Sequence, residues 1–138
     1  MNLRRLGLFS VLASVSLMPV LVSPALAADG VYDRAAASGT PEWMDEYSGW
    51  NNDCSFMTIA VDVVEEPSHG EVTPHPEIKR IPEKAARGSS GVCAGRKMKA
   101  LVLYYKSEPG YSGTDSFKVR MKVRGQKSAF FVYNVTVE

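Results

Sequence analysis

Two runs of alternating apolar and polar residues near the C-terminal end constrain the fold more than any other feature. In residues 116–123 every second residue is apolar, beginning at Phe117, and the residues between are Ser116, Lys118, Arg120 and Lys122. In residues 129–137 every second residue from Ala129 to Val137 is also apolar or aromatic, and the short segment RGQK lies between the two runs. Two half-buried strands joined by a short glycine-containing turn indicate a β-hairpin. An isolated hairpin is marginally stable in water, so further strands must cover its apolar face.

Further strand-like segments occur earlier in the sequence. Residues 55–64 are rich in β-branched side chains, and residues 100–105 are apolar at every position, which predicts a strand buried on both faces. Residues 71–84 contain three prolines and therefore predict an edge strand or a loop. With about seven short strands and no long helix, the pattern predicts an all-β, immunoglobulin-like antiparallel sandwich. A small barrel is the alternative.

Residues 1–27 have the pattern of a secretory signal peptide. Arg4 and Arg5 precede an apolar run over residues 6–22, and Ala25-Leu26-Ala27 is a small-residue cleavage site. We therefore expect cleavage after Ala27, no membrane span in the mature chain, and a periplasmic or secreted location. A permanent membrane helix is the weaker alternative. The remaining 111 residues are enough for one small domain.

The chain contains two cysteines, Cys54 and Cys93. In an oxidising compartment an isolated pair predicts one disulfide, which would stabilise the fold by roughly 3–4 kcal/mol in the loop-entropy model. A zinc site would need more ligands, and His69 and His75 are the only histidines. These residues lack the close ligand spacing of zinc fingers. We therefore expect no metal and no cofactor.

Residues 28–53 show no sustained hydrophobic period. We expect an irregular N-terminal arm, with a short helical turn over residues 41–47, followed by the sandwich domain in residues 54–138. Trp43 and Trp50 lie in this arm, and large aromatic side chains predict that it is pinned to the core. A sugar-stacking platform is the alternative interpretation of these two tryptophans.

Charge is distributed unevenly along the sequence. Residues 29–77 contain eleven acidic residues and one base, whereas residues 79–127 contain thirteen bases and three acidic residues. One interpretation is that the two halves neutralise one another within the fold. The other is a surface for an anionic partner. The candidate residues for that surface are Lys97, Lys99, Lys118, Arg120 and Lys122.

The segment GYSGTD, residues 110–115, is the best candidate for chemistry and also for a structural turn. It does not match the G-x-S-x-G nucleophile elbow, because Thr114 replaces the last glycine. As a turn, Gly110 and Gly113 would adopt positive φ, and Asp115 would bind backbone amides of the turn. Tyr111 would bond its hydroxyl back to the chain, and Phe117 would be the first core residue of the next strand. We expect no catalytic residue here.

A wider motif set accompanies this turn. Pro67–Val72 reads PSHGEV, Leu103–Tyr105 reads LYY, and Pro109–Phe117 reads PGYSGTDSF. Together they resemble the bacterial immunoglobulin-like and cadherin-like modules of surface proteins, over residues 55–138. The resemblance implies a sandwich fold with a role in binding or scaffolding. Three features depart from those modules: a single copy, the cysteine pair, and no cadherin-type calcium linker, so calcium binding is not implied.

These observations predict a small non-enzymatic module that mediates protein binding or a structural interaction of the cell envelope. A binder of anionic polymer, such as polysaccharide, lipopolysaccharide or extracellular DNA, is one alternative. A protease inhibitor that uses an exposed loop in residues 64–91 is another. The partner would be an envelope protein or an anionic polymer.

Overall fold

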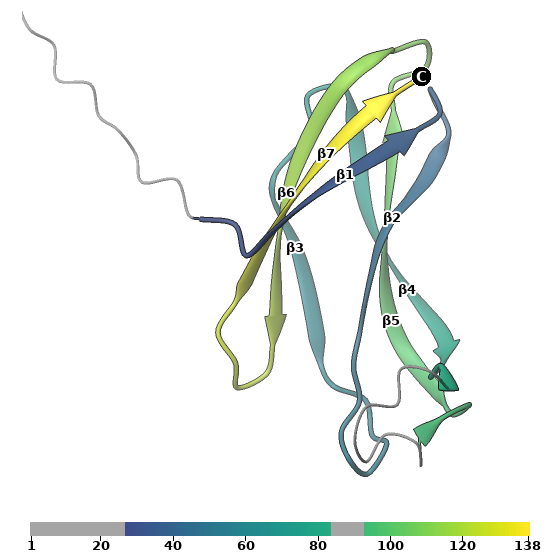
Figure 1. The fold of residues 1–138 in the computed structure, drawn as a ribbon, viewed down its shortest axis with the longest axis vertical. Helices are drawn as coiled ribbons and strands as arrows, with labels where there is room; N and C mark the ends of the chain where they lie inside the picture. The colour runs from purple at the N-terminus through teal and green to yellow at the C-terminus, as the bar shows by residue number, and fades with distance from the viewer. Residues whose placement is uncertain (1–26, 84–92) are drawn as a thin grey trace, which may run out of the picture.

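The computed structural model describes residues 27–83 and 93–138, which form seven strands (Figure 1). The predicted signal peptide, except Ala27, lies outside the described residues. The strands are β1 (Gly30–Ala36), β2 (Pro41–Ser48), β3 (Ile59–Glu65), β4 (Gly70–Arg80), β5 (Lys97–Ser107), β6 (Gly113–Val123) and β7 (Ala129–Val137). The described part of the chain contains no helix long and apolar enough to cross a membrane.

The strands form two sheets, which confirms the predicted all-β sandwich. One sheet has the order β1-β7-β6-β3, and the other has the order β2-β5-β4. This is the immunoglobulin arrangement, in which the second, fifth and fourth strands face the third, sixth and seventh. All strand pairs are antiparallel except one, because β1 runs parallel to β7. A parallel pair needs a long connection, and here the rest of the domain separates the two strands.

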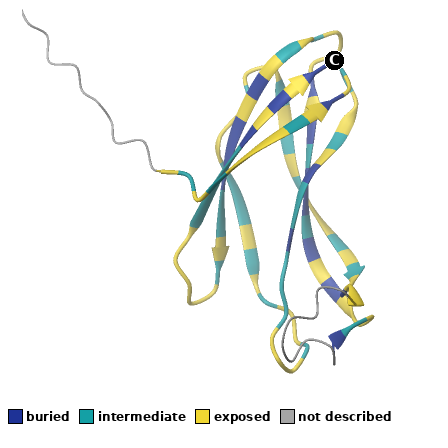
Figure 2. Cartoon of the chain, viewed as in Figure 1, coloured by how far each residue is buried: buried dark blue, intermediate teal, exposed yellow. Residues whose placement is uncertain are grey.

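The main core lies between the sheets, in the half of the sandwich that contains the C-terminus (Figure 2). Phe117 is 1% exposed and confirms its predicted place as the first core residue of β6. Its ring stacks between Tyr133, at a centroid distance of 4.9 Å, and Tyr105, at 6.2 Å. The aromatic stack therefore joins β5, β6 and β7 across the two sheets.

The predicted irregular arm of residues 28–53 is wrong, because this segment supplies β1 and β2. The sandwich therefore begins at β1, and not at residue 54. The pairing of β2 with β5 shifts between Trp43 and Asp45. This bulge leaves Met44 and Tyr47, three residues apart, both buried in the core. An apolar spacing of three does not show the alternation of a regular strand, and the predicted helical turn over residues 41–47 is wrong.

Two of the three other strand predictions are confirmed. β5 is buried on both faces at Val102 and Leu103, both 0% exposed. β4 is the edge strand expected from its prolines. β3 begins at Ile59, later than the predicted start at residue 55.

The predicted disulfide between Cys54 and Cys93 is present. It joins the β2–β3 connection to the residues that precede β5, at the end of the sandwich opposite the C-terminus (Figure 1). There Cys93 packs with Ile81 and Met98 in a second small core, with Trp50 against it. Trp50 therefore anchors this end of the molecule, as predicted from its size.

The GYSGTD segment is a turn. Gly110 and Gly113 have φ values of 82° and 146°, and the Tyr111 hydroxyl donates to Thr114 O at 2.7 Å. These features confirm the predicted roles. Asp115 differs from the prediction, because its carboxylate reaches across to another turn.

The carboxylate of Asp115 accepts hydrogen bonds of 2.9 Å from the backbone amides of Ser68 and His69. It also accepts one from the Ser116 amide, next along the chain. Through the Ser68 and His69 amides, Asp115 therefore fastens the β3–β4 turn to β6. The predicted bonds to the turn that precedes β6 are not the ones it makes.

Candidate functional site

The five basic residues predicted to bind an anionic partner do not form one surface. Lys118, Arg120 and Lys122 lie on β6, whereas Lys97 and Lys99 lie on β5 in the other sheet. The prediction that Lys118 is solvated is wrong, because the residue is only 7% exposed. The long aliphatic stem of a lysine can pack on apolar surface, and here the ammonium lies 5.8 Å from the centroid of the Phe130 ring.

Each of the three β6 cations has a carboxylate partner on β3. Lys118 Nζ lies 3.2 Å from Glu65, and Arg120 and Lys122 each lie 2.8 Å from Asp62. The hydrogen bonds from Lys122 and Arg120 hold the pKa of Asp62 below its usual value. The acidic and basic halves of the sequence therefore neutralise one another across the β3–β6 pair, as the first interpretation predicted.

An apolar groove opens where both sheets end, at β3 and β4. Its volume is about 660 Å³, within the range of ligand sites. The lining residues come from β2, β4, β5, β3 and the segment before β3: Tyr47, Phe56, Met57, Thr58, Ile59, Pro76, Glu77, Ile78, Lys99, Ala100 and Leu101. Of these residues, only Lys99 was predicted from the sequence to belong to a binding surface.

The groove is exposed because the two sheets end at different places. On β4, Val72 packs against the main core, and Pro76 and Ile78 continue the same alternation along the strand. Ile78, however, is 60% exposed. The opposite sheet ends at β3 and supplies no strand to cover this part of β4. Phe56, 40% exposed, lines the same groove.

The groove contains one cation without a carboxylate partner. Lys99 Nζ lies 5.8 Å from the centroid of the Phe56 ring, and no carboxylate in residues 27–83 or 93–138 forms an ion pair with it. Glu77, the acidic residue of the lining, is engaged elsewhere. It accepts a hydrogen bond of 3.0 Å from the Tyr104 hydroxyl and lies 3.7 Å from Lys79 Nζ.

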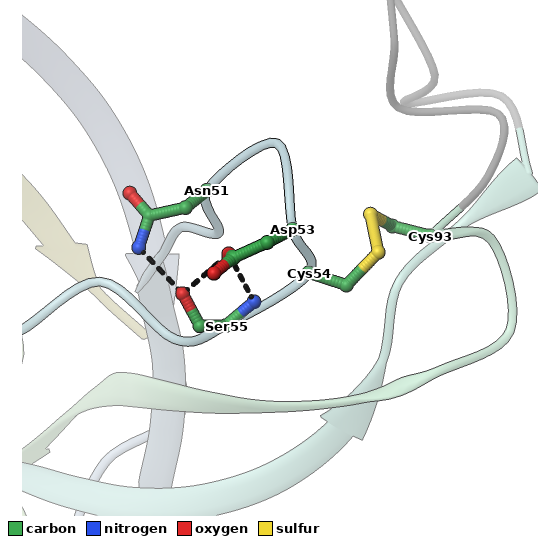
Figure 3. The surroundings of a disulfide bond; sticks show 5 residues. All are labelled: Asn51, Asp53, Cys54, Ser55 and Cys93. Atoms are coloured by element: carbon green, nitrogen blue, oxygen red, sulfur yellow. Dashed lines mark hydrogen bonds between the residues drawn. A yellow bond between two sulfur atoms is a disulfide. The ribbon is translucent and has the colours of Figure 1, made fainter.

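A network of short hydrogen bonds shapes the loop that carries Phe56 (Figure 3). The Asp53 carboxylate accepts bonds from the Ser55 hydroxyl at 2.6 Å and from the Ser55 amide at 3.0 Å. These two bonds lower the pKa of Asp53. Asn51 Nδ2 donates to the same hydroxyl at 2.8 Å, and the disulfide at Cys54 ties the loop to Cys93. The Phe56 side of the groove is therefore held by a cross-linked loop.

A second polar and aromatic cluster lies among β1, β2 and β7. The Arg34 guanidinium is 5.2 Å from the centroid of Tyr32, 5.7 Å from that of Tyr133 and 5.9 Å from that of Trp43. Trp43 is 49% exposed, but Arg34 lies against its ring. The sugar-stacking interpretation loses its support, because this cation competes for the aromatic face.

Two tyrosine hydroxyls in this cluster are satisfied within the protein. Tyr133 donates to Asp45 at 2.6 Å and lies 2.5 Å from the Tyr47 hydroxyl. Burial raises the pKa of both tyrosines. Both hydroxyls therefore stay protonated at neutral pH, and they bridge β2 and β7 across the two sheets.

Sequence comparison gives no relative on which to base a function, because no family model and no curated protein matches the chain. Within the described residues, no group of three or more histidine, cysteine, aspartate or glutamate side chains could hold a metal ion. The groove was not predicted from the sequence, because the prolines of β4 concealed the alternation of that strand. The one available signal was Ile78, an apolar residue between charged neighbours.

Proposed function

We propose that this protein is an exported, non-enzymatic, immunoglobulin-like module that binds another protein through the apolar groove. The observation that carries the proposal is the exposure of Ile78 and Phe56, two large apolar side chains that line the same groove. The disulfide supports an oxidising, extracytoplasmic location, either periplasmic or secreted.

The form of the groove favours a polypeptide ligand. It lies beside the edge strands β3 and β4, and its lining is largely apolar. Lys99 in this lining contacts the Phe56 ring and forms no ion pair with a carboxylate of the described residues. Apolar surface of this kind on a soluble domain marks interaction sites. Protein interfaces combine such an apolar centre with a polar rim. A groove that opens to solvent suits an elongated chain better than a small molecule, which needs enclosure.

The alternatives have less support. An anionic polymer would have to compete with Asp62 and Glu65 for the cations of β6. A protease inhibitor was suggested by an exposed loop in residues 64–91, but residues 70–80 of that segment form β4. Residues 84–92 lie outside the described part of the chain.

The proposal is tested with the purified, disulfide-bonded protein immobilised on resin and incubated with envelope extract from its own host. The proteins retained by the wild-type chain are identified by mass spectrometry, and their affinities are then measured by calorimetry. We expect Ile78→Asp to abolish retention. The matched control is Val31→Asp, because Val31 is 61% exposed and lies on β1, away from the groove.

Equal loss of retention in both variants would show that the groove has no special part in binding. Full retention by Ile78→Asp would refute the proposed function. Thermal unfolding of each variant verifies that the fold is intact.

A further inference from the structure

Among the described residues, the peptide groups on the outer edge of β3 have no strand to pair with. Arg124 N donates to Thr58 O at 3.4 Å. This bond shows that the even-numbered residues at this end of β3 direct their peptide groups toward β6. Since peptide groups alternate in direction along a strand, those of Ala60 and Asp62 face β6. Those of Ile59, Val61 and Val63 face away from the sheet. In the segment that precedes Ile59 the edge is already paired within the chain, because Met57 N donates to Gly49 O at 3.0 Å.

The neighbouring edge of β4 is blocked. Ile81 N donates to Arg96 O at 2.9 Å, so the odd-numbered residues of β4 direct their peptide groups to β5. Pro74 and Pro76 therefore stand at positions that face outward, and neither has an amide hydrogen. Prolines on an exposed edge prevent pairing with another strand. β3 has no such protection, since the sequence of Ile59–Glu65 contains no proline.

The open edge and the groove adjoin one another at Ile59, which belongs to both. A strand added to β3 would extend the four-stranded sheet beyond its present end. Alternate side chains of that strand would point inward, toward the uncovered Pro76 and Ile78 of β4. Its backbone would pair with the edge at the same time. Such strand addition obtains affinity from the main chain and specificity from the side-chain pockets.

We propose that the open edge of β3 accepts an extended segment of a partner protein. The inward-facing residues of that segment are β-branched or other apolar residues, and it carries a carboxylate that pairs with Lys99. The charge follows from the lack of an ion-pair partner for Lys99 among the described residues. This inference rests on the proposed function, since it specifies the class of ligand and the way in which it binds.

The probe is a library of random twelve-residue peptides, displayed and selected on the immobilised, disulfide-bonded protein. We expect the enriched sequences to alternate apolar and polar residues and to contain an acidic residue. Amide hydrogen exchange measured by NMR then locates the bound peptide. In the free protein the amides of Ile59, Val61 and Val63 should exchange fast, whereas those of Ala60 and Asp62 should be protected. The selected peptide should protect the first three.

Two substitutions at Val61 separate backbone pairing from side-chain packing. Val61→Pro removes the outward amide and leaves the ladder with β6 in place, whereas Val61→Ala keeps that amide. We expect Val61→Pro to weaken the selected peptide by about tenfold or more, and Val61→Ala to weaken it much less. Repeating the selection on Lys99→Glu should replace the acidic residue of the enriched peptides by a basic one.

The outcomes separate this inference from the proposed function. If Ile78→Asp abolishes peptide binding but the Ile59, Val61 and Val63 amides stay unprotected, the groove binds protein and strand addition is refuted. If no peptide is enriched, or if Ile78→Asp binds as the wild type does, the groove itself is refuted as the site. Protection of the three amides that rises with protein concentration alone would assign the edge to a second copy of this chain and overturn the partner proposed here. These readouts on the wild-type protein decide the question even if Val61→Pro fails to fold.

Discussion

The hydroxyl group of Tyr105 donates a hydrogen bond of 2.9 Å to the carboxylate of Asp115 and thereby connects the two sheets. Tyr105 lies on β5 and Asp115 on β6. The same carboxylate accepts amide hydrogen bonds from the β3–β4 turn. One acidic side chain therefore ties together both sheets and the turn from which β3 and β4 diverge toward the groove.

Replacing Asp115 by asparagine should destabilise the protein by about 2–3 kcal/mol, since an amide group cannot accept all of these hydrogen bonds and leaves buried or part-buried donors unpaired. Urea unfolding followed by tryptophan fluorescence measures the change. The control is Ser116→Ala, at an exposed position next along the chain. Equal stability of the two variants would contradict the role given to Asp115.

Acid should destabilise the protein partly through Asp115. Burial raises the pKa of this carboxyl, but the bonds from Ser68, His69, Ser116 and Tyr105 outweigh burial and hold the pKa below the ordinary value of 3.8. The unfolded chain therefore takes up the proton first as the pH falls. The stabilising contribution is complete above the unfolded pKa and is lost as the pH falls through the folded pKa.

Melting temperatures measured between about pH 2 and pH 6 should therefore fall on the acid side. Asp115→Asn should show a shallower fall than the wild type. Some acid dependence should remain in this variant, because Asp53 and Asp62 also have lowered pKa values. An unchanged acid slope in Asp115→Asn would exclude this carboxyl as a source of the dependence.

Truncation of the aromatic stack should be severe. Phe117→Ala removes a ring that is 1% exposed and lies between two tyrosine rings, and we expect a loss of roughly 3–5 kcal/mol. Ser112→Ala, five positions earlier at an exposed site of the turn, should leave stability and binding unchanged. Near-wild-type stability of Phe117→Ala would show that the stack is not the centre of the core.

Gly70 is required by a close approach between β4 and β5. A Cβ atom at this position would lie 2.6 Å from Lys106 O and 2.8 Å from the Tyr105 ring. Gly70→Ala should therefore shift the strands and lower the midpoint of urea unfolding. Gly49→Ala is the matched control, since its nearest contact is the flexible Met57 side chain at 3.0 Å. A larger effect at Gly49 than at Gly70 would contradict this account.

The acidic residues of β3 should mask the cations of β6. Asp62→Asn removes the carboxylate shared by Arg120 and Lys122, so the variant should elute from heparin resin at higher salt than the wild type. Asp33→Asn on β1 changes the net charge equally and is the control. If both variants elute together, total charge and not local pairing governs retention.

Much of the fold was predictable because it depends on local patterns. The apolar residues at every second position of residues 117–123 and 129–137 predict a hairpin, and the prolines of residues 71–84 predict an edge strand or a loop. Strands β1 and β2 were not predictable in this way. β1 is an edge strand with few buried residues, and the bulge in β2 shifts its apolar residues out of alternation.

The candidate site was less predictable than the fold. Alternation in the sequence correctly placed the basic residues of β6 on one face of a strand. It did not reveal the carboxylates that neutralise them. Asp62 and Arg120 are 58 positions apart, and nothing local links them. Phe56 and Ile78 likewise belong to separate segments of the chain. Only the packing of the two sheets decides that both side chains stay exposed in the folded protein.

The sequence by itself determined that the chain forms a disulfide-bonded, all-β domain with a structural GYSGTD turn. These properties follow from residue alternation, turn chemistry and the cysteine pair, all of which act over short distances or through residue type. Only the tertiary structure decided which charges pair, where the sheets end and which apolar residues remain uncovered. Burial and pairing depend on segments far apart in the chain, so the groove beside Ile78 and the open edge at Val61 exist only once the two sheets have packed.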